Sequence, residues 1–442
     1  MKPVFFVALA HTDTVAYFNT DTSPLRTRIS NLNLFPDSLK ENLLFSMSFD
    51  SKIHYESWSS SLDPVGDSIQ LDKETSLPKR IFADCGAYQG DVELDFNVAW
   101  NYYEMKHVNS EHRWDEILLC SPDQIIKPDM DDEETASRFE FIETNAAPFL
   151  EKCNSDSRIY AVGVIHGRTI NERKKQYKMF KSLGYEYVAL GGMVPYSTKQ
   201  DQVLDIVAGI KDIDNPIIES DSILDRCRKD GIKLHVFGLN SPEWIRWWYR
   251  LQIDSFDGSK LSTEGAANGW YYIPNDGKGP GREKILKPKK VGELYHRIAV
   301  SKMAINRNNW YKKPKSGHSL WDIKYRDELN FKAHRDLLIS GKNIFVNGVH
   351  TQCFCPACQY LKSSRCTSKR CWFGKETPGH YHVADPRMMG STEHNMGRVA
   401  HNAFVFSWII KQIERFNKLA DESEITDEKA WLLNWKTVEG EL

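Results

Sequence analysis

The chain contains 442 residues, of which 41% are hydrophobic and 27% are charged, and its formal net charge is −2. This length suggests one to three domains, and the composition is that of an ordinary soluble globular protein. No segment approaches the roughly 18 consecutive apolar residues of a membrane span, and the charge of the whole chain gives no sign of nucleic-acid binding.

The first residues, MKPVFFVALAHTDT, are interpreted as a strand and not as a signal peptide, because the apolar run is short and no cleavage pattern follows it. The nine cysteines are an odd number, and five of them lie between Cys353 and Cys371. This distribution favours thiols and metal ligands over a disulfide framework, and it predicts a cytoplasmic protein.

Short apolar runs recur along the chain, each followed by a polar or glycine-rich turn and then by an amphipathic stretch. The runs cover residues 4–10, 80–86, 116–126, 159–167, 187–193, 233–239, 253–259 and 343–349. Helices are predicted between several of them, among them 169–184, which ends at Gly184, and 241–252, which begins with Ser-Pro-Glu. Eight strands joined by helices predict an α/β fold, a (β/α)8 TIM-type barrel, with a doubly wound open sheet as the alternative.

Polar residues fall at the ends of these runs. Asp84, His166, Gly191-Gly192 and Asp257 each lie at the C-terminal end of a predicted strand. In a barrel of parallel strands these ends surround one active site, so their placement favours the barrel over the open sheet.

Two basic stretches stand out against the neutral chain. Twelve lysines and arginines lie between Lys278 and Lys315, opposed only by Glu283 and Glu293, and residues 362–375 are basic with no acid. Trp310, Tyr311 and Trp372 are interleaved with them. This pattern indicates a face that binds a polyanion, which we assign to an insertion at about 277–342 and to the cysteine-rich segment.

The cysteine-rich segment predicts a zinc site. Cys353, Cys355 and Cys358 form the sequence CFCPAC, and thiolates are ligands that suit tetrahedral zinc. Spacing leaves the fourth ligand open among Cys366, Cys371, His380, His382 and His394.

Asp84, in FADCGAYQG, and Asp257, in IDSFDGS, are the candidate catalytic residues. Each follows an apolar run and precedes small residues, which leave room for a ligand to approach the backbone. Two carboxylates can perform glycosidic chemistry, one as the nucleophile at an anomeric carbon and the other as general acid and base.

Taken in order, these segments resemble the tRNA-guanine transglycosylase family between about residues 80 and 410. The resembling segments are FADCGAYQG (82–90), YAVGVIHG (160–167), GYEYVALGGM (184–193), HVFGLNSPEW (235–244), IDSFDGS (253–259), CFCPACQ (353–359) and EHNM (393–396). The resemblance implies a catalytic barrel over residues 1–345, an inserted zinc-binding subdomain over 346–399, and a C-terminal helix over 400–442 that closes the barrel. It also implies that His394 is the fourth ligand of a structural zinc ion.

The resemblance further implies a mechanism with two displacements. Asp257 would attack the sugar C1′ and expel guanine, and Asp84 would handle the proton of the leaving and incoming bases. Asp129 would read the edge of the base, with Asp123 and Asp131 as neighbouring alternatives. The other residues that it assigns to the base are Tyr88 for stacking, Cys85 and His166 for binding, and Gly192 and Met193 for backbone contacts.

Departures from the tRNA enzymes favour a DNA substrate. Cys85-Gly86-Ala87 replaces Ser-Gly-Gly, His166 replaces a base-reading glutamine, and GSKLSTEGAANGWYY (258–272) replaces a stretch that grips the anticodon loop. This pattern is closer to the DNA-acting (DpdA-type) enzymes, which exchange guanine for a 7-deazaguanine, usually 7-cyano-7-deazaguanine. A tRNA enzyme, a non-catalytic nucleic-acid-binding partner subunit and a glycoside hydrolase are the alternatives. The DNA-acting relatives typically function with helper proteins.

Overall fold

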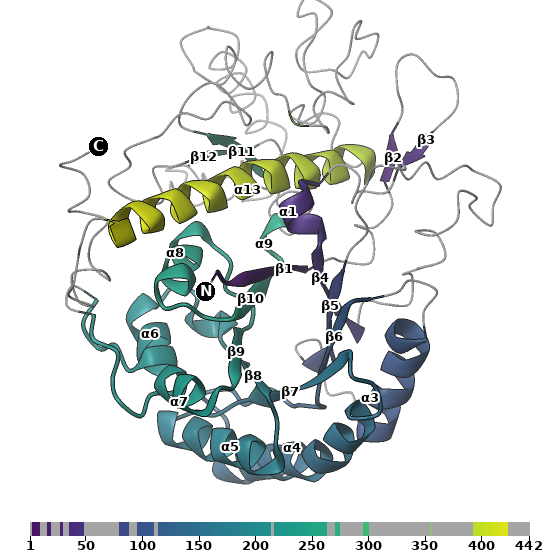
Figure 1. Ribbon diagram of the computed structural model, residues 1–442, viewed down its shortest axis with the longest axis vertical. Coiled ribbons are helices and arrows are strands. Elements are labelled where there is room, and N and C mark those ends of the chain that lie inside the picture. The colour runs from purple at the N-terminus through teal and green to yellow at the C-terminus, as the bar shows by residue number, and fades with distance from the viewer. Residues whose placement is uncertain are drawn as a thin grey trace, which may run out of the picture.

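The computed structural model (Figure 1) describes residues 2–8, 16–18, 27–29, 35–47, 79–87, 95–109, 114–213, 216–262, 270–274, 295–299, 355 and 392–422. Within the last of these segments, side chains are described for residues 399–414.

Eight parallel strands form a closed barrel in the order β1-β10-β9-β8-β7-β6-β5-β4. They are β1 (Val4–Ala8), β4 (Asn42–Ser46), β5 (Arg80–Asp84), β6 (Glu116–Cys120), β7 (Ile159–Ile165), β8 (Tyr187–Leu190), β9 (Lys233–Val236) and β10 (Ser255–Gly258). β1 closes the ring because it pairs with β10 on one side and with β4 on the other. The predicted barrel is therefore confirmed, and the open sheet is wrong.

Seven of the eight barrel strands coincide with predicted runs, and one does not. β4 was not predicted, because its apolar part spans only three residues, Leu43 to Phe45, directly after the short helix α1 (Asp37–Lys40). The predicted run at 343–349 lies outside the described residues, and the eight places in the barrel are filled without it.

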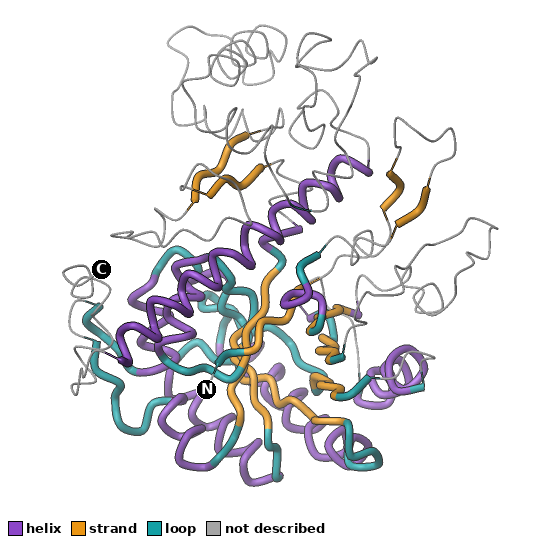
Figure 2. The backbone as a smooth tube through the Cα atoms, turned by 45° about the horizontal axis from the view of Figure 1, so that its top comes forward, coloured by secondary structure: helices purple, strands orange, loops and turns teal. Residues whose placement is uncertain are grey.

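Helices surround the strands, which gather at the centre of Figure 2. They are α3 (Phe96–Tyr103), continued by the π-helix η4 (Glu104–Val108), and then α4 (Asp132–Cys153), α5 (Ile170–Leu183), α6 (Gln200–Ala208), α7 (Ile223–Asp230) and α8 (Pro242–Arg250). Local sequence sets their ends. α5 begins in a capping box of Thr169 and Glu172 and ends at Gly184 in the left-handed conformation, as predicted.

Two antiparallel hairpins and two further short helices complete the described part of the chain. β2 (Ala16–Phe18) pairs with β3 (Thr27–Ile29), and β11 (Trp270–Pro274) pairs with β12 (Tyr295–Ala299). The short helices are the 3₁₀ turn η5 (Val194–Tyr196) and α9 (Lys260–Ser262). Among the described helices, none has the length and apolar character needed to cross a membrane.

The last described helix, α13 (Thr392–Glu422), runs past α8, α9 and α1 (Figure 1) and packs against all three. The Phe406 ring lies 5.5 Å from the Phe5 ring of β1, which is itself stacked 5.1 Å from Phe256 of β10. This helix begins at residue 392, within the segment predicted as the zinc-binding subdomain; most of that segment lies outside the described residues.

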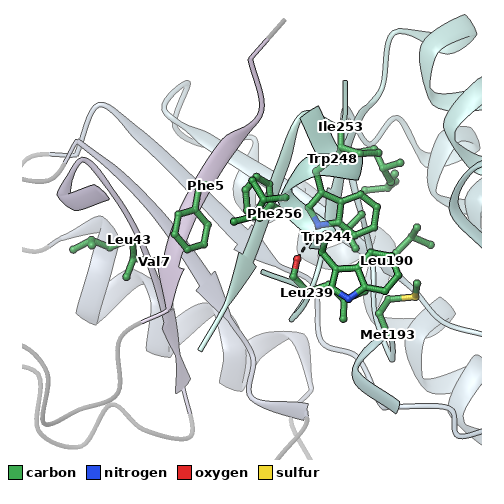
Figure 3. Packing of buried hydrophobic residues seen from close by; sticks show 14 of the residues in the cluster. Phe5, Val7, Leu43, Leu190, Met193, Leu239, Trp244, Trp248, Ile253 and Phe256 are labelled. Atoms are coloured by element: carbon green, nitrogen blue, oxygen red, sulfur yellow. Dashed lines mark hydrogen bonds between the residues drawn. The ribbon is translucent and has the colours of Figure 1, made fainter. Parts of the chain in front are cut away.

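Alternation along the strands separates two hydrophobic layers. Odd and even positions face opposite ways, so Phe5 and Phe256 pack toward the helices, whereas Phe6 and Phe82 fill the barrel interior. Figure 3 shows the outer layer, with Phe5 beside Phe256 and the indoles of Trp244 and Trp248 nearby. Asp257 follows Phe256 of the outer layer, so its side chain is directed into the barrel. The same holds for other residues near strand ends that alternate with outer-layer residues.

Replacing Phe406 by Ala is expected to lower the free energy of unfolding by about 3–5 kcal/mol, because the fully buried ring bridges α13 and β1 and leaves a cavity when removed. Denaturation in urea measures the loss. Phe404→Ala on the same helix is the matched control, because Phe404 is only partly buried. Equal losses for the two variants would contradict the role assigned to Phe406.

Candidate active site at the C-terminal mouth of the barrel

The polar residues predicted from sequence meet at one end of the barrel. Asp84 is the last residue of β5, His166 follows β7 directly, and Gly191 follows β8 directly. Asp257 lies in β10 and pairs in register with Phe6 of β1. This end is the one at which barrels of this architecture carry their active sites.

Asp84 has the electrostatic properties of a general acid and base. Burial raises the pKa of the Asp84 carboxyl to about 7, and the negative charges of Asp123 and Asp257 add to the shift. Hydrogen bonds from Ser46 and from the Gly86 backbone oppose the shift without cancelling it. A carboxyl with a pKa near neutral can both give and take a proton at physiological pH.

Next to Asp84 lies a buried cluster of Cys85, Asp123 and His166. The Cys85 thiol donates to Asp123 Oδ1 at 2.6 Å, and His166 Nε2 donates to Asp123 Oδ2 at 2.5 Å. Burial, with the charges of Asp123 and Asp84, raises the pKa of the Cys85 thiol well above its usual value, so the sulfur keeps its proton. The His166 backbone N–H donates to Gln176 Oε1 at 2.6 Å, which fixes the chain at this point.

His166 also offers an unused polar atom. Its Nδ1 is buried and has no hydrogen-bond partner among the described residues. The ring lies so close to Gly191 that a β-carbon there would meet His166 Cε1 at 2.4 Å, so only glycine fits. A buried nitrogen without a partner costs free energy unless a ligand supplies one, which indicates a ligand-binding site.

The side chain of Arg173 holds the Gly191-Gly192 turn through a hydrogen bond. The Arg173 side chain is buried, and its Nη1 donates to the Gly191 carbonyl at 3.1 Å. Gly192 has a φ of 66°, in the left-handed region that glycine adopts without strain. Burial lowers the pKa of Arg173 to about 10, so the guanidinium remains a cation beneath the turn.

Asp257 is held by donors on one of its oxygens. The Gly238 N–H donates to Oδ1 at 2.8 Å, and His235 Nε2 lies 3.2 Å from the same atom. No hydrogen bond to Oδ2 is found within the described part of the chain. Asp257 thus has one anchored oxygen and one available for attack.

Burial distinguishes Asp123 from Asp129, two of the aspartates that the sequence left open as the residue that reads the base. The side chain of Asp129, predicted to read the base, is exposed in the turn before α4, whereas Asp123 is buried between Cys85 and His166. The sequence favoured Asp129 because the family motif was matched by order alone, and the turn after β6 carries several aspartates. Asp123 is the residue whose position suits the role.

Two other predicted base-contacting residues have different outcomes. Tyr88 lies outside the described residues. The Met193 side chain is buried in the core between barrel and helices, so its backbone is the part left for the predicted contact.

Several residues of the site were not singled out from the sequence. They are Ser46, Tyr187, His235, Gly238 and Ser255. A signal was present for Ser255, which lies two positions before Asp257 and so faces the same way in a strand. His235 alternates with Leu234 and Val236, the pattern of a polar side chain turned into the barrel.

Asp84, Cys85 and Asp123 also offer donor atoms within 4.8 Å of one another, the one such group of three metal-type donors within the described part of the chain. A cation could bridge them. In the structure the thiol proton of Cys85 and the N–H of His166 already meet the oxygens of Asp123. Each oxygen of Asp123 therefore already has a donor, and a metal would have to displace the thiol proton.

Of the three cysteines in the predicted zinc motif, the structure describes Cys355, which is buried against α13. Cys355 Sγ lies 3.3 Å from His401 Nδ1, and His401 Nε2 donates to the Tyr272 carbonyl at 2.8 Å. Zinc bonds of about 2.3 Å to sulfur and 2.0 Å to nitrogen, at a tetrahedral angle, separate the two ligand atoms by about 3.5 Å. The hydrogen bond to Tyr272 fixes the tautomer in which Nδ1, the atom that faces Cys355, carries no proton. The pair fits zinc.

This arrangement favours His401 over the predicted His394 as the histidine of the zinc site. The two residues lie seven positions apart on α13, which separates them by about 10 Å along the helix axis. Of these two histidines, His401 is the one that the structure places beside Cys355. Cys353, Cys358, Cys366, Cys371, His380 and His382 lie outside the described residues.

A cavity of about 420 Å³ opens at the opposite, N-terminal end of the barrel. Four of the charged residues that line it form ion pairs, Lys79 with Glu41 and Arg80 with Glu116. It lies away from the carboxylates described above and has no comparable chemistry.

The sequence matches no protein-family model, and no curated protein matches it.

His401→Ala is expected to lower the bound zinc per chain from about one to near zero, because tetrahedral structural sites need all four ligands. His394→Ala is the matched control and should keep its zinc. Elemental analysis of purified protein gives the metal content, and thermal unfolding with and without a chelator gives its contribution to stability. Zinc lost from the His394 variant and kept by the His401 variant would restore the prediction made from sequence, and a simple thiol–imidazole hydrogen bond predicts no zinc in either.

Proposed function

We propose that the protein is a transglycosylase that exchanges guanine in DNA for a 7-deazaguanine base, 7-cyano-7-deazaguanine, through a covalent aspartyl-glycosyl intermediate. The observation that supports this proposal most strongly is that two carboxylates lie at the same mouth of the barrel in different environments. Asp84 has a pKa near 7, and Asp257 has one oxygen anchored by two donors. Pairs of titratable groups whose environments differ in this way divide into acid-base and nucleophile roles.

The first displacement uses both carboxylates. Asp257 Oδ2 forms a bond to C1′ of the target nucleotide while the bond from C1′ to N9 of guanine breaks. The electron pair of that bond leaves with the base, and protonated Asp84 supplies the proton that the base needs. The products are free guanine and a glycosyl ester of Asp257.

The second displacement reverses these roles. The incoming 7-deazaguanine loses its N9 proton to the Asp84 carboxylate, and N9 forms the new bond to C1′. The ester bond to Asp257 breaks, and its electron pair returns to the carboxylate. Two inversions leave the anomeric configuration of the nucleotide unchanged.

The cluster of Cys85, Asp123 and His166 supports the assignment of the substrate as a purine base. A guanine-like base presents N–H donors along one edge and acceptors along another, and the cluster offers both kinds of partner. The carboxylate of Asp123 accepts hydrogen bonds, the thiol of Cys85 is a donor, and His166 Nδ1 is a buried ring nitrogen without a partner within the described part of the chain. The target nucleotide must leave its stack to reach such a buried site.

The choice of DNA rests on the sequence departures from the tRNA enzymes. The basic residues 278–315 and 362–375, which would contact phosphates, lie outside the described residues except for Arg297, in β12. Phosphate contacts do not separate DNA from RNA, so the experiment must offer both. Zinc in this proposal is structural and takes no part in the displacements.

Purified protein with labelled 7-cyano-7-deazaguanine is expected to place label in DNA, and Asp257→Asn should lower incorporation on the order of 10⁴-fold or more. Duplex DNA, single-stranded DNA and unmodified tRNA are offered in parallel. Asp129→Asn is the matched control, because it makes the same chemical change on an exposed residue.

Label in tRNA alone would overturn the DNA assignment and keep the mechanism. Unchanged incorporation by the Asp257 variant would contradict the nucleophile. Sugar release without base exchange would indicate a hydrolase, and nucleic-acid binding with neither reaction would indicate a partner subunit.

The two half-reactions are expected to respond to pH in opposite directions. Release of guanine needs protonated Asp84, so its rate should fall as pH rises through about 7. Attack by the incoming base needs the carboxylate, so its rate should rise with pH. The ester of Asp257 carries no charge, which removes one cause of the raised pKa, so the midpoint of the second profile should lie below that of the first.

Single-turnover measurements separate the two profiles, with guanine release followed first and base uptake by the isolated glycosyl-enzyme second. Two profiles that move in the same direction with pH would contradict a single residue serving as acid and base.

A further inference from the structure

A chain of hydrogen bonds runs through the barrel interior beneath Asp257. The Tyr187 hydroxyl lies 2.6 Å from Ser255 Oγ, and Ser255 Oγ lies 2.8 Å from His235 Nδ1. His235 Nε2 lies 3.2 Å from Asp257 Oδ1, the oxygen to which the Gly238 N–H also donates. The chain therefore ends at the anchored oxygen of the candidate nucleophile.

Aromatic rings enclose the imidazole at the centre of this chain. The His235 ring lies 4.3 Å from the Phe82 ring and 4.6 Å from the Phe237 ring, and Phe6 approaches it at 6.2 Å. The side chain is fully buried. Burial lowers the pKa of His235 more than the neighbouring Asp257 raises it, so the imidazole is neutral and carries a single N–H.

These contacts assign every proton in the chain. A carboxylate oxygen accepts only, so Nε2 of His235 carries the hydrogen and donates to Asp257. Nδ1 is then an acceptor, and the Ser255 hydroxyl must donate to it. The Ser255 oxygen in turn accepts from the Tyr187 hydroxyl. The Asp257 carboxylate thus selects the tautomer of His235, and the hydroxyls of Ser255 and Tyr187 satisfy the acceptor that this tautomer leaves at Nδ1.

We propose that His235 is a positioning residue that, together with the Gly238 N–H, holds Oδ1 of Asp257 so that Oδ2 is the attacking oxygen. The inference rests on the proposed function and deepens it. No proton moves along the chain in either displacement. His235 acts by direction and by electrostatics, because its N–H fixes the plane of the carboxylate.

The same two donors act in the second displacement. When the ester bond to Oδ2 breaks, the electron pair is shared across the carboxylate, and the growing charge on Oδ1 meets the N–H groups of His235 and Gly238. Fixed donors aimed at an oxygen that gains charge stabilise the transition state, and the enclosing rings exclude water that would weaken the effect.

His235→Phe and His235→Gln test the donor. Phe matches the shape of the aromatic enclosure but has no N–H, so kcat should fall about 100-fold or more while KM for DNA stays close to that of the unmodified protein. Gln has an amide that can donate from a position near that of Nε2, so it should recover most of the lost activity. His107→Phe is the matched control, since His107 is another buried histidine packed among aromatic rings, outside the barrel interior.

A second readout does not depend on base exchange. Nitrogen-15 NMR of histidine-labelled protein, with the His235 signals identified by their absence from the His235→Gln spectrum, should give a neutral imidazole protonated at Nε2. Ser255→Ala removes the donor to Nδ1 and should move the Nδ1 resonance, while the Asp257 carboxylate keeps the hydrogen on Nε2. A cationic ring, an Nδ1–H tautomer or an unaltered spectrum in the Ser255 variant would overturn the proposed hydrogen-bond chain.

The kinetic and NMR measurements distinguish failure of the positioning role from failure of the proposed function. An active enzyme whose His235→Phe variant folds and keeps its kcat would overturn the positioning role alone. No base exchange by the unmodified protein would overturn the proposed function, and the NMR result would still decide whether His235 holds Asp257. Equal losses in the Phe and Gln variants, with lowered thermal stability in both, would reduce His235 to a packing role.

Discussion

The pairing of β1 with both β10 and β4 is the constraint on which the rest of the described structure depends. It joins the beginning of the chain to a strand more than two hundred residues away, with Phe6 in register with Asp257. Once the ring is closed, strand alternation decides which side chains face the helices and which face the interior. The candidate site follows from this geometry, because closure through β1 and β4 brings Asp257 of β10 to the same mouth as Asp84 of β5.

Closure of the barrel also brings the carboxyl groups of Asp84, Asp123 and Asp257 to one mouth. Each of the three has different neighbours. Asp84 has its pKa raised to about 7 by burial and by its acidic neighbours, so it exchanges protons near neutrality. Asp123 is compensated by the thiol of Cys85 and the imidazole of His166. Asp257 is compensated by a backbone N–H and by His235. Three similar side chains thus have three different environments, and the difference lies in their neighbours and not in their chemistry.

The sequence predicts the barrel well because parallel strands buried on both faces are short apolar runs, and seven of these runs are visible. β4 is not predicted, because its three apolar residues are too few to identify a strand. Asp84 and Asp257 are predictable because Asp84 is the last residue of its strand and Asp257 is the last but one. The choice of Asp123 over Asp129 is not, because both lie in one turn and only burial separates them. His235 is similar: its alternation within β9 is visible, but its contact with Asp257 depends on the pairing of β9 with β10.

α13 relates the nucleic-acid-binding part of the proposal to this site. Phe406 fixes the helix to β1, while His401 and Asn402 hold the carbonyl and the N–H of Tyr272 in β11. β12 pairs with β11, and Cys355 packs on His401. The connection at 275–294 therefore starts and ends in the hairpin held by α13, and the segment at 300–354 starts at that hairpin and ends at Cys355. Together these connections carry nearly all of the basic residues between Lys278 and Lys315. α13 thus holds the hairpin and Cys355, between which these connections start and end, and it packs through Phe406 on β1, the neighbour of the strand that carries Asp257.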